Sequence, residues 1–145
     1  MERSPEGQLF TDIILEVFKL SGLLATAGDR LTRDQQMSSA RWKVLGALAR
    51  SPSPMTVSQI AQSMGQSRQG VQRIANELLE LGVLVFEENP LHKKAKLLVL
   101  TAKGFEVLQQ IEAKQIPWAN ACAQGMDVTE MTQALAMLRK LAQVC

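Results

Sequence analysis

Several residue types are scarce in this sequence, and each shortage excludes a class of protein. Tyrosine is absent and aromatic residues make up 4% of the chain, so we do not expect single-stranded nucleic acid to stack its bases on rows of aromatic side chains. The two cysteines, Cys122 and Cys145, form neither a CxxC motif nor a disulfide framework. With His92 as the only histidine, a zinc site of Cys and His ligands is nearly excluded. The sequence therefore predicts no metal and no cofactor.

Long apolar runs are also missing. No stretch approaches the roughly 20 apolar residues that a membrane-spanning helix needs, and the amino-terminal residues lack the basic start and apolar core of a secretion signal. With so few cysteines, we expect a reduced, cytoplasmic protein. We also expect no enzyme, because histidine, cysteine and clustered carboxylates are scarce and no glycine-rich phosphate loop is present.

What remains is the composition of an ordinary globular protein. The 145 residues are 46% hydrophobic and 21% charged, which is enough to bury one sizeable core. Apolar side chains recur at helical spacing over residues 9–24 and 39–50. We expect the polar residues 25–38 to form a connector, and Pro52 and Pro54 to end the second helix. The net charge of +2 decides nothing, so the positions of the charges matter more.

The middle of the chain carries signals for two short helices in succession. Thr56 and Gln59 have the spacing of a capping box, which opens the first of them. Gly65 favours a left-handed turn after it. Ser67 can then cap a second helix over 67–81, which a glycine ends. This order is that of a helix–turn–helix.

Two β-like runs follow, and further helices complete the chain. Residues 83–86 and 97–100 are apolar and flank a basic, turn-forming loop, which predicts a hairpin wing over 83–100. Thr101 can cap a long helix, which Pro117 should kink or break. A last amphipathic helix comes after it. The sequence thus predicts a mainly α fold with a small β-hairpin wing.

The helix over 67–81 has two faces of opposite character. One face is apolar, and the other carries amide and basic side chains at the same helical spacing. The apolar residues are Val71, Ile74, Ala75, Leu78 and Leu81, and the polar residues are Gln69, Gln72, Arg73 and Asn76. Arginine can donate two bonds to guanine, and Gln or Asn can pair with adenine. The basic residues lie toward the amino-terminal end, which enters the major groove in helix–turn–helix docking. The alternative is the ordinary solvated face of a helical bundle.

The predicted wing tip concentrates positive charge. It carries His92, Lys93, Lys94 and Lys96. Such side chains can reach the phosphate backbone or an adjacent minor groove. A solvated, lysine-rich edge that prevents aggregation is the alternative. Beside a helix–turn–helix, contact with DNA is the favoured interpretation.

Three segments resemble the MarR family of winged helix–turn–helix transcription regulators. They are RWKVLGAL (41–48), TVSQIAQSMGQSRQGVQRIANELLELGVL (56–84) and NPLHKKAKLLVLTAKG (89–104). The strand that runs directly into LTAKG is the most specific of these matches. By this resemblance we expect double-stranded DNA as the partner, and release of that DNA by a small, often aromatic or phenolic, effector.

The resemblance also implies a layout for the whole chain. Residues 1–145 would form a single MarR-like domain, with the winged helix–turn–helix at 39–103. Its recognition helix would be 67–81. Residues 8–26 and 104–145 would form a helical dimerisation region, so that a homodimer binds the two halves of a pseudo-palindromic operator. The first and last helices independently favour a dimer, because their apolar arcs are wider than one neighbour covers.

Site residues follow from the resemblance and from the two basic surfaces together. By position in the family, Arg68, Gln69, Gln72 and Arg73 would face the major groove and Lys93 would lie at the wing tip. The full set of predicted DNA-binding residues is Ser67, Arg68, Gln69, Gln72, Arg73, Asn76, His92, Lys93 and Lys94. Many family members have Asp-Arg-Arg at the wing, where this chain has His-Lys-Lys. Because lysine lacks the planar fork of arginine, we expect the wing to contact the backbone more than to read the minor groove.

An effector site and a redox role are less well marked. By the resemblance, Trp42 and the apolar side of helix 9–24 would line an effector space; the alternative is that Trp42 simply belongs to the core. Some family members sense oxidants through a cysteine in the first long helix, but no cysteine precedes Cys122. Cys122 has no visible positive charge or helix start beside it, so we expect a buried, unreactive thiol.

Two functions of different class are therefore compatible with the sequence. The favoured one is a sequence-specific, double-stranded-DNA-binding transcriptional regulator, a repressor that an effector releases. The alternative is a winged-helix module that binds another protein and no DNA. A protein-binding surface should carry apolar anchors at positions 69, 72, 73 and 76, where this chain has amides and an arginine.

Overall fold

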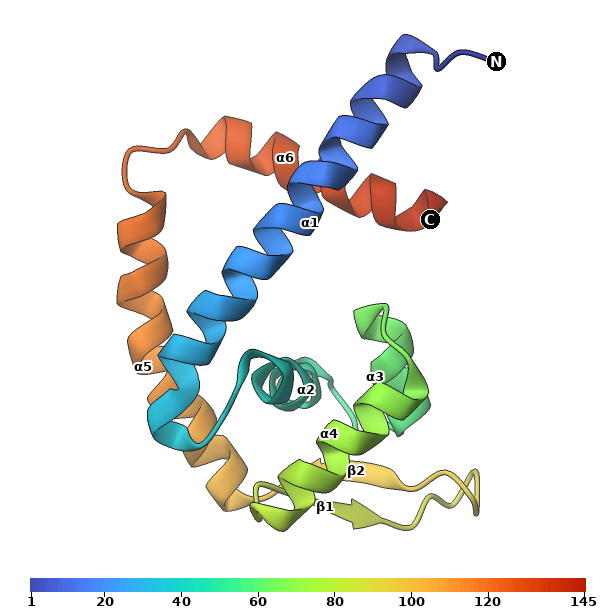
Figure 1. Cartoon of the computed structure of the whole chain (residues 1–145). Helices are drawn as coiled ribbons and strands as arrows, with labels where there is room; N and C mark the ends of the chain where they lie inside the picture. The colour runs from blue at the N-terminus through green and yellow to red at the C-terminus, as the bar shows by residue number, and fades with distance from the viewer. The chain divides into compact units, whose positions relative to one another are not determined.

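The computed structural model describes all 145 residues, and it is mainly helical with one antiparallel hairpin (Figure 1). In chain order the elements are α1 (Pro5–Thr32), the 3-10 helix η1 (Arg33–Gln35), α2 (Ser39–Arg50), α3 (Val57–Met64), α4 (Arg68–Glu80), β1 (Leu84–Glu87), β2 (Leu97–Leu100), α5 (Ala102–Ala123) and α6 (Val128–Val144). The predicted fold class is confirmed. The chain divides into two compact units, Met1–Glu112 and Ala113–Cys145.

Helix α1 is longer than the sequence pattern indicated. The polar stretch after residue 24 was expected to be a connector, but the helix continues to Thr32. Contacts with the start of α2 explain the difference. A carboxylate oxygen of Asp29 accepts the Ser39 amide at 2.7 Å. Gly28 allows close approach, because a Cβ there would lie 2.9 Å from the Ser39 hydroxyl oxygen. These polar residues therefore attach α1 to α2.

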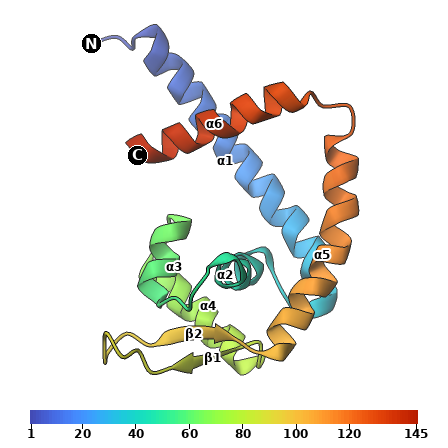
Figure 2. The ribbon, with the colours of Figure 1, turned by 180° about the vertical axis from the view of Figure 1, so that it is seen from behind.

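The core of the first unit lies where α2, α3, α4 and the hairpin meet. Val44, Leu45, Ile60, Leu78 and Leu98 are at most 1% exposed. The ribbon shows α2 surrounded by α3, α4 and the hairpin, and the view from behind agrees (Figure 2). The beginning of α5 joins the same core through Val107 and Ile111. This packing leaves the outer side of α4 facing away from the protein.

The turns of the helix–turn–helix form as their capping residues predict. The Thr56 hydroxyl accepts the Gln59 amide at 3.2 Å, and the Gln59 side chain accepts the Thr56 amide at 2.9 Å. Gly65 has a left-handed conformation, with φ of 63°. The Ser67 hydroxyl accepts the Gly70 amide at 3.1 Å. Local hydrogen bonds thus fix where α3 and α4 begin.

The hairpin is short, and hydrogen bonds close the turn at its tip. Leu84 pairs with Leu100 and Glu87 with Leu97, so β1 begins one residue later than predicted. At the tip, the Asn89 carbonyl accepts the His92 amide at 3.1 Å, and the Asn89 side chain accepts the Leu91 amide at 3.0 Å. These two bonds hold the basic tip in a defined turn.

The residues after β2 attach the wing to the end of α4. The Thr101 hydroxyl donates to the Gly82 carbonyl at 2.7 Å, and the Lys103 ammonium donates to the Leu81 carbonyl at 2.7 Å. Gly104 packs directly against the backbone here, since a Cβ at this position would collide with the Val83 carbonyl oxygen. The TAKG segment therefore connects the wing, α4 and α5.

The carboxyl-terminal unit differs from two expectations. Helix α5 runs through Pro117 to Ala123, so a break at this proline is not observed; the proline removes one amide donor without ending the helix. Cys122 is exposed in the single chain, so the prediction that it is buried is wrong. No helix combines the length and apolar character that crossing a bilayer requires. The cytoplasmic location stays a prediction.

Replacing Gly104 with alanine should destabilise the protein. The added methyl would strike backbone that cannot move freely, and such overpacking costs about 1–3 kcal/mol. Urea unfolding followed by circular dichroism measures the change in the free energy of unfolding. Gly46→Ala is the matched control, because a Cβ there meets only the flexible side chain of Arg50. Equal stability of the two variants would contradict the close contact at Gly104.

Candidate nucleic-acid interface

The outer face of α4 is polar and exposed, and its inner face is buried. Val71, Ala75 and Leu78 are fully inaccessible, and Ile74 is 7% exposed. The predicted contact residues on the other face are all exposed: Gln69, Gln72, Arg73 and Asn76. The two-faced helix expected from the sequence is thus present, and its amide and basic side chains point to solvent.

The amino-terminal end of α4 combines a cap with a positive charge. The Ser67 hydroxyl is occupied by the Gly70 amide, so its first role is to cap the helix. Arg68 follows as the first helical residue and is exposed. Unpaired amides and the helix dipole make such an end favourable for phosphate.

Side chains on the exposed face are already aligned with one another. The Gln72 amide nitrogen donates to the Asn76 side-chain oxygen at 2.9 Å, one helical turn further on. This bond leaves the Gln72 oxygen and the Asn76 amide free to face base edges. Arg73 lies 3.7 Å from Glu77 and keeps 73% of its side chain exposed.

A groove separates α4 from the wing. Its volume is about 940 Å³, and it is lined by the ends of α3 and α4 on one side and by the hairpin on the other. The predicted residues that it brings together are Arg68, Gln69, Gln72, His92 and Lys94. Arg73 and Asn76 instead line a second hollow of about 450 Å³ along α4. Ser67 and Lys93 line neither.

Some residues of the groove were not predicted. Ser58 and Gln59 contribute from the start of α3, and Asn89 contributes from the wing. For Ser58 and Gln59 the sequence did contain a signal, because the capping box fixes the start of α3. That the start of α3 faces the groove follows only from the packing of α3 against α4.

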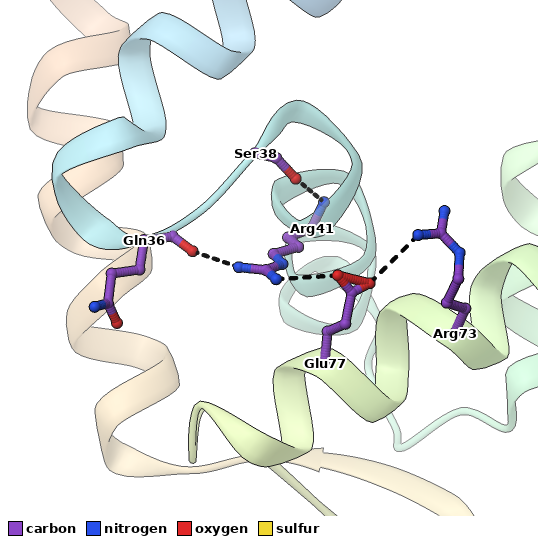
Figure 3. Close-up of polar contacts among 5 residues, drawn as sticks. All are labelled: Gln36, Ser38, Arg41, Arg73 and Glu77. Carbon is purple, nitrogen blue, oxygen red and sulfur yellow. Dashed lines mark hydrogen bonds and ion pairs between the residues drawn. The ribbon is translucent and has the colours of Figure 1, made fainter.

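The charges of the groove are mainly positive. Arg68, His92, Lys94 and Lys96 contribute basic groups, and Lys96 has an acidic neighbour in Glu88 at 3.8 Å. Glu77, the acidic residue nearest to Arg73, turns toward Arg41 of α2 at 3.0 Å (Figure 3). An arrangement of this kind attracts a polyanion along the wing and the beginning of α4.

The position of Trp42 is compatible with both of its predicted roles, in the core and in an effector site. The side chain is half-buried and packs against the core of the first unit. Its membership of an effector space therefore stays a prediction. No group of three or more His, Cys, Asp or Glu side chains is arranged to hold a metal ion.

Comparison with known proteins gives the same architecture. A family model described as "MarR family" matches residues 35–95. Uncharacterized proteins of Mycobacterium bovis and Mycobacterium tuberculosis are 36% identical over 129 residues, which is 89% of this chain and 89% of theirs.

Solved structures of transcription regulators superpose on most of the chain. The transcriptional regulator PA3341 is 28% identical, with a TM-score of 0.78 over 91% of this chain and 97% of its own. CouR from Rhodococcus jostii RHA1, solved with p-coumaroyl-CoA, is 19% identical, with a TM-score of 0.80 over 90% of this chain and 92% of its own. A MarR/EmrR family regulator from Acinetobacter sp. ADP1 is 18% identical, with a TM-score of 0.81 over 92% and 94% of the two chains. Together with the polar face of α4 and the basic wing, these matches show that the chain belongs to the MarR family of DNA-binding, winged helix–turn–helix transcription regulators.

Proposed function

We propose that this protein is a homodimeric repressor that binds a pseudo-palindromic, double-stranded DNA site and leaves it when a small effector binds. The observation that carries the proposal is the groove between α4 and the wing. It gathers Arg68, Gln69 and Gln72 with His92 and Lys94 from the hairpin. A surface with base-reading groups on one wall and cations on the other fits one side of a duplex.

The contacts divide into two kinds. Gln69, Gln72, Arg73 and Asn76 project from the helix that would enter the major groove, so they are the base-reading candidates. Arg68 at the helix start and the wing residues His92, Lys93 and Lys94 would contact phosphates. Phosphate contacts position the protein, whereas contacts with base edges select the sequence.

The exposed apolar surface of α1 supports the dimer. Large side chains along this helix are uncovered in the single chain: Leu9 63%, Leu15 60%, Phe18 69%, Leu20 51% and Leu23 59%. In α6, no residue is buried at all. Monomers seldom expose apolar surface on this scale, and a second copy would cover it. Two copies would also supply two recognition helices for the two half-sites.

The proposed effector is a small aromatic molecule. A structural neighbour, CouR, was crystallised with p-coumaroyl-CoA, an aromatic ligand. An aromatic or phenolic compound near Trp42 is the corresponding proposal for this protein. Trp42 packs against the core that also holds the inner side of α4 and the hairpin. A ligand bound beside Trp42 would therefore act on the elements that position α4 and the wing.

A protein partner remains the alternative, and one residue favours it. Leu91 is 89% exposed at the wing tip, where it is the large apolar side chain of an otherwise basic turn. Selection of bound sequences from random double-stranded DNA separates the two functions. Enrichment of a symmetric motif supports the repressor, and failure to enrich any sequence overturns it.

Arg73→Ala should weaken binding to the selected site by about 1–3 kcal/mol, because it removes a base contact. Binding to unrelated DNA of the same length should change little. Gel-shift or fluorescence titrations with both DNAs measure the two affinities. An equal loss on both DNAs would show that Arg73 contacts only the backbone.

Lys93→Ala should weaken binding to the selected site and to unrelated DNA about equally. Affinity falls as salt rises, and each lost phosphate contact should make this dependence of log affinity on log salt less steep by about one unit per protomer. Titrations between low and moderate salt measure this slope. A loss confined to the selected site would contradict a backbone role for the wing.

Sedimentation at micromolar concentration should show a particle of twice the chain's mass. Replacing both Leu15 and Phe18 with glutamate should produce a monomer, because charges would enter the apolar face of α1. Helical circular dichroism checks that the variant is folded, and DNA titration checks that it loses affinity for the selected site. A wild-type monomer would contradict the dimer.

A further inference from the structure

Glu77, on the carboxyl-terminal half of α4, lies between two arginines (Figure 3). Its Oε1 accepts from Nη2 of Arg41 at 3.0 Å, and its Oε2 lies 3.7 Å from Nη1 of Arg73. Oε2 is buried and has no hydrogen-bond partner. One half of the carboxylate is therefore bonded, and the other half is aimed at a predicted base-reading residue.

The Arg41 side of this arrangement is fixed. Nη1 of Arg41 donates to the Gln36 carbonyl at 2.8 Å, and the Arg41 amide donates to the Ser38 hydroxyl at 3.2 Å. The Arg41 side chain is 28% exposed, so α2 and the connector before it surround it closely. Arg41 thus holds Glu77 in one orientation relative to the protein body.

The Arg73 side is free to move. Its side chain is 73% exposed, and the 3.7 Å separation from Oε2 is longer than a hydrogen bond. A small rotation of Arg73 would close this distance and give the buried oxygen its missing donor. Arginine has five N–H donors in a planar fork, so a guanidinium held at one edge still presents another edge.

We propose that Glu77 is a specificity-determining positioning residue, which holds the guanidinium of Arg73 so that its free edge meets a guanine in the major groove. The inference rests on the proposed function, in which Arg73 reads a base. A carboxylate so close to DNA would otherwise repel phosphate, and its pairing with two cations offsets that repulsion. Glu77 would therefore increase the selectivity for one base pair while adding nothing to general affinity.

The test compares selectivity at individual base pairs. The position that Arg73 reads is defined as the one where Arg73→Ala loses discrimination among the four base pairs. Glu77→Gln should lower discrimination at that position by roughly five- to tenfold, since it removes the charged acceptor that would hold Arg73 in the complex with DNA. At the other positions it should leave discrimination unchanged. Affinity for unrelated DNA should stay equal or rise, because one negative charge is removed.

A matched control and a second variant complete the experiment. Glu80→Gln removes the same charge from the same helix, where the carboxylate forms no ion pair, so it should keep wild-type discrimination. Glu77→Asp keeps the charge but withdraws the carboxylate from Arg73, and it should lose discrimination as Glu77→Gln does. Thermal unfolding and affinity for unrelated DNA show that each variant is folded.

The double variant of Glu77→Gln and Arg73→Ala gives the decisive comparison. In the Arg73→Ala background, Glu77→Gln should have no further effect on discrimination. An effect of equal size in both backgrounds, or one spread over all positions, would overturn the positioning role and leave the proposed DNA binding intact. If the wild type selects no sequence, the proposed function fails as well.

Discussion

Burial of the inner side of α4 determines what its outer side can do. Val71, Ala75 and Leu78 are inaccessible in a core shared with α2 and the hairpin. Burying a valine or leucine side chain contributes about 1.5–3 kcal/mol to stability. Rotating the helix would expose several of these side chains and lose that contribution for each. Packing of the inner side therefore fixes the direction in which the exposed amides and arginines project. Ser67 and Gly70 then fix where the helix begins, and the positive end faces the wing groove.

Much of this could be predicted from the sequence because the signals are local. The capping box of Thr56 and Gln59, the left-handed Gly65 and the cap at Ser67 depend on residues within a few positions of one another. The polar and apolar faces of α4 follow from helical spacing alone. Each of these features depends on residues that are close together in the sequence, so predicting it requires no knowledge of the fold.

The features that the sequence did not predict depend on contacts between distant segments. Helix α1 extends past its apolar stretch because Asp29 and Gly28 meet Ser39 of α2. Glu77 and Arg41 are 36 positions apart, and only packing brings them together. Cys122 was expected to be buried because cysteine behaves as a small apolar residue, yet nothing in the single chain covers it. Spacing along a sequence carries no information about such pairs.

The bonds from Thr101 and Lys103 to the end of α4 have a consequence for how DNA could be released. The hairpin begins just after α4, and the residues that follow its second strand donate hydrogen bonds back to the Leu81 and Gly82 carbonyls, directly after the last turn of α4. The base of the wing is therefore attached to the carboxyl-terminal end of α4 on both strands, so the wing and α4 should move together. In the proposed repressor, effector binding would therefore leave the separation between the wing and α4 largely unchanged. In the proposed homodimer the effector would instead change the spacing and tilt between the α4–wing units of the two copies, so that only one copy fits its half-site.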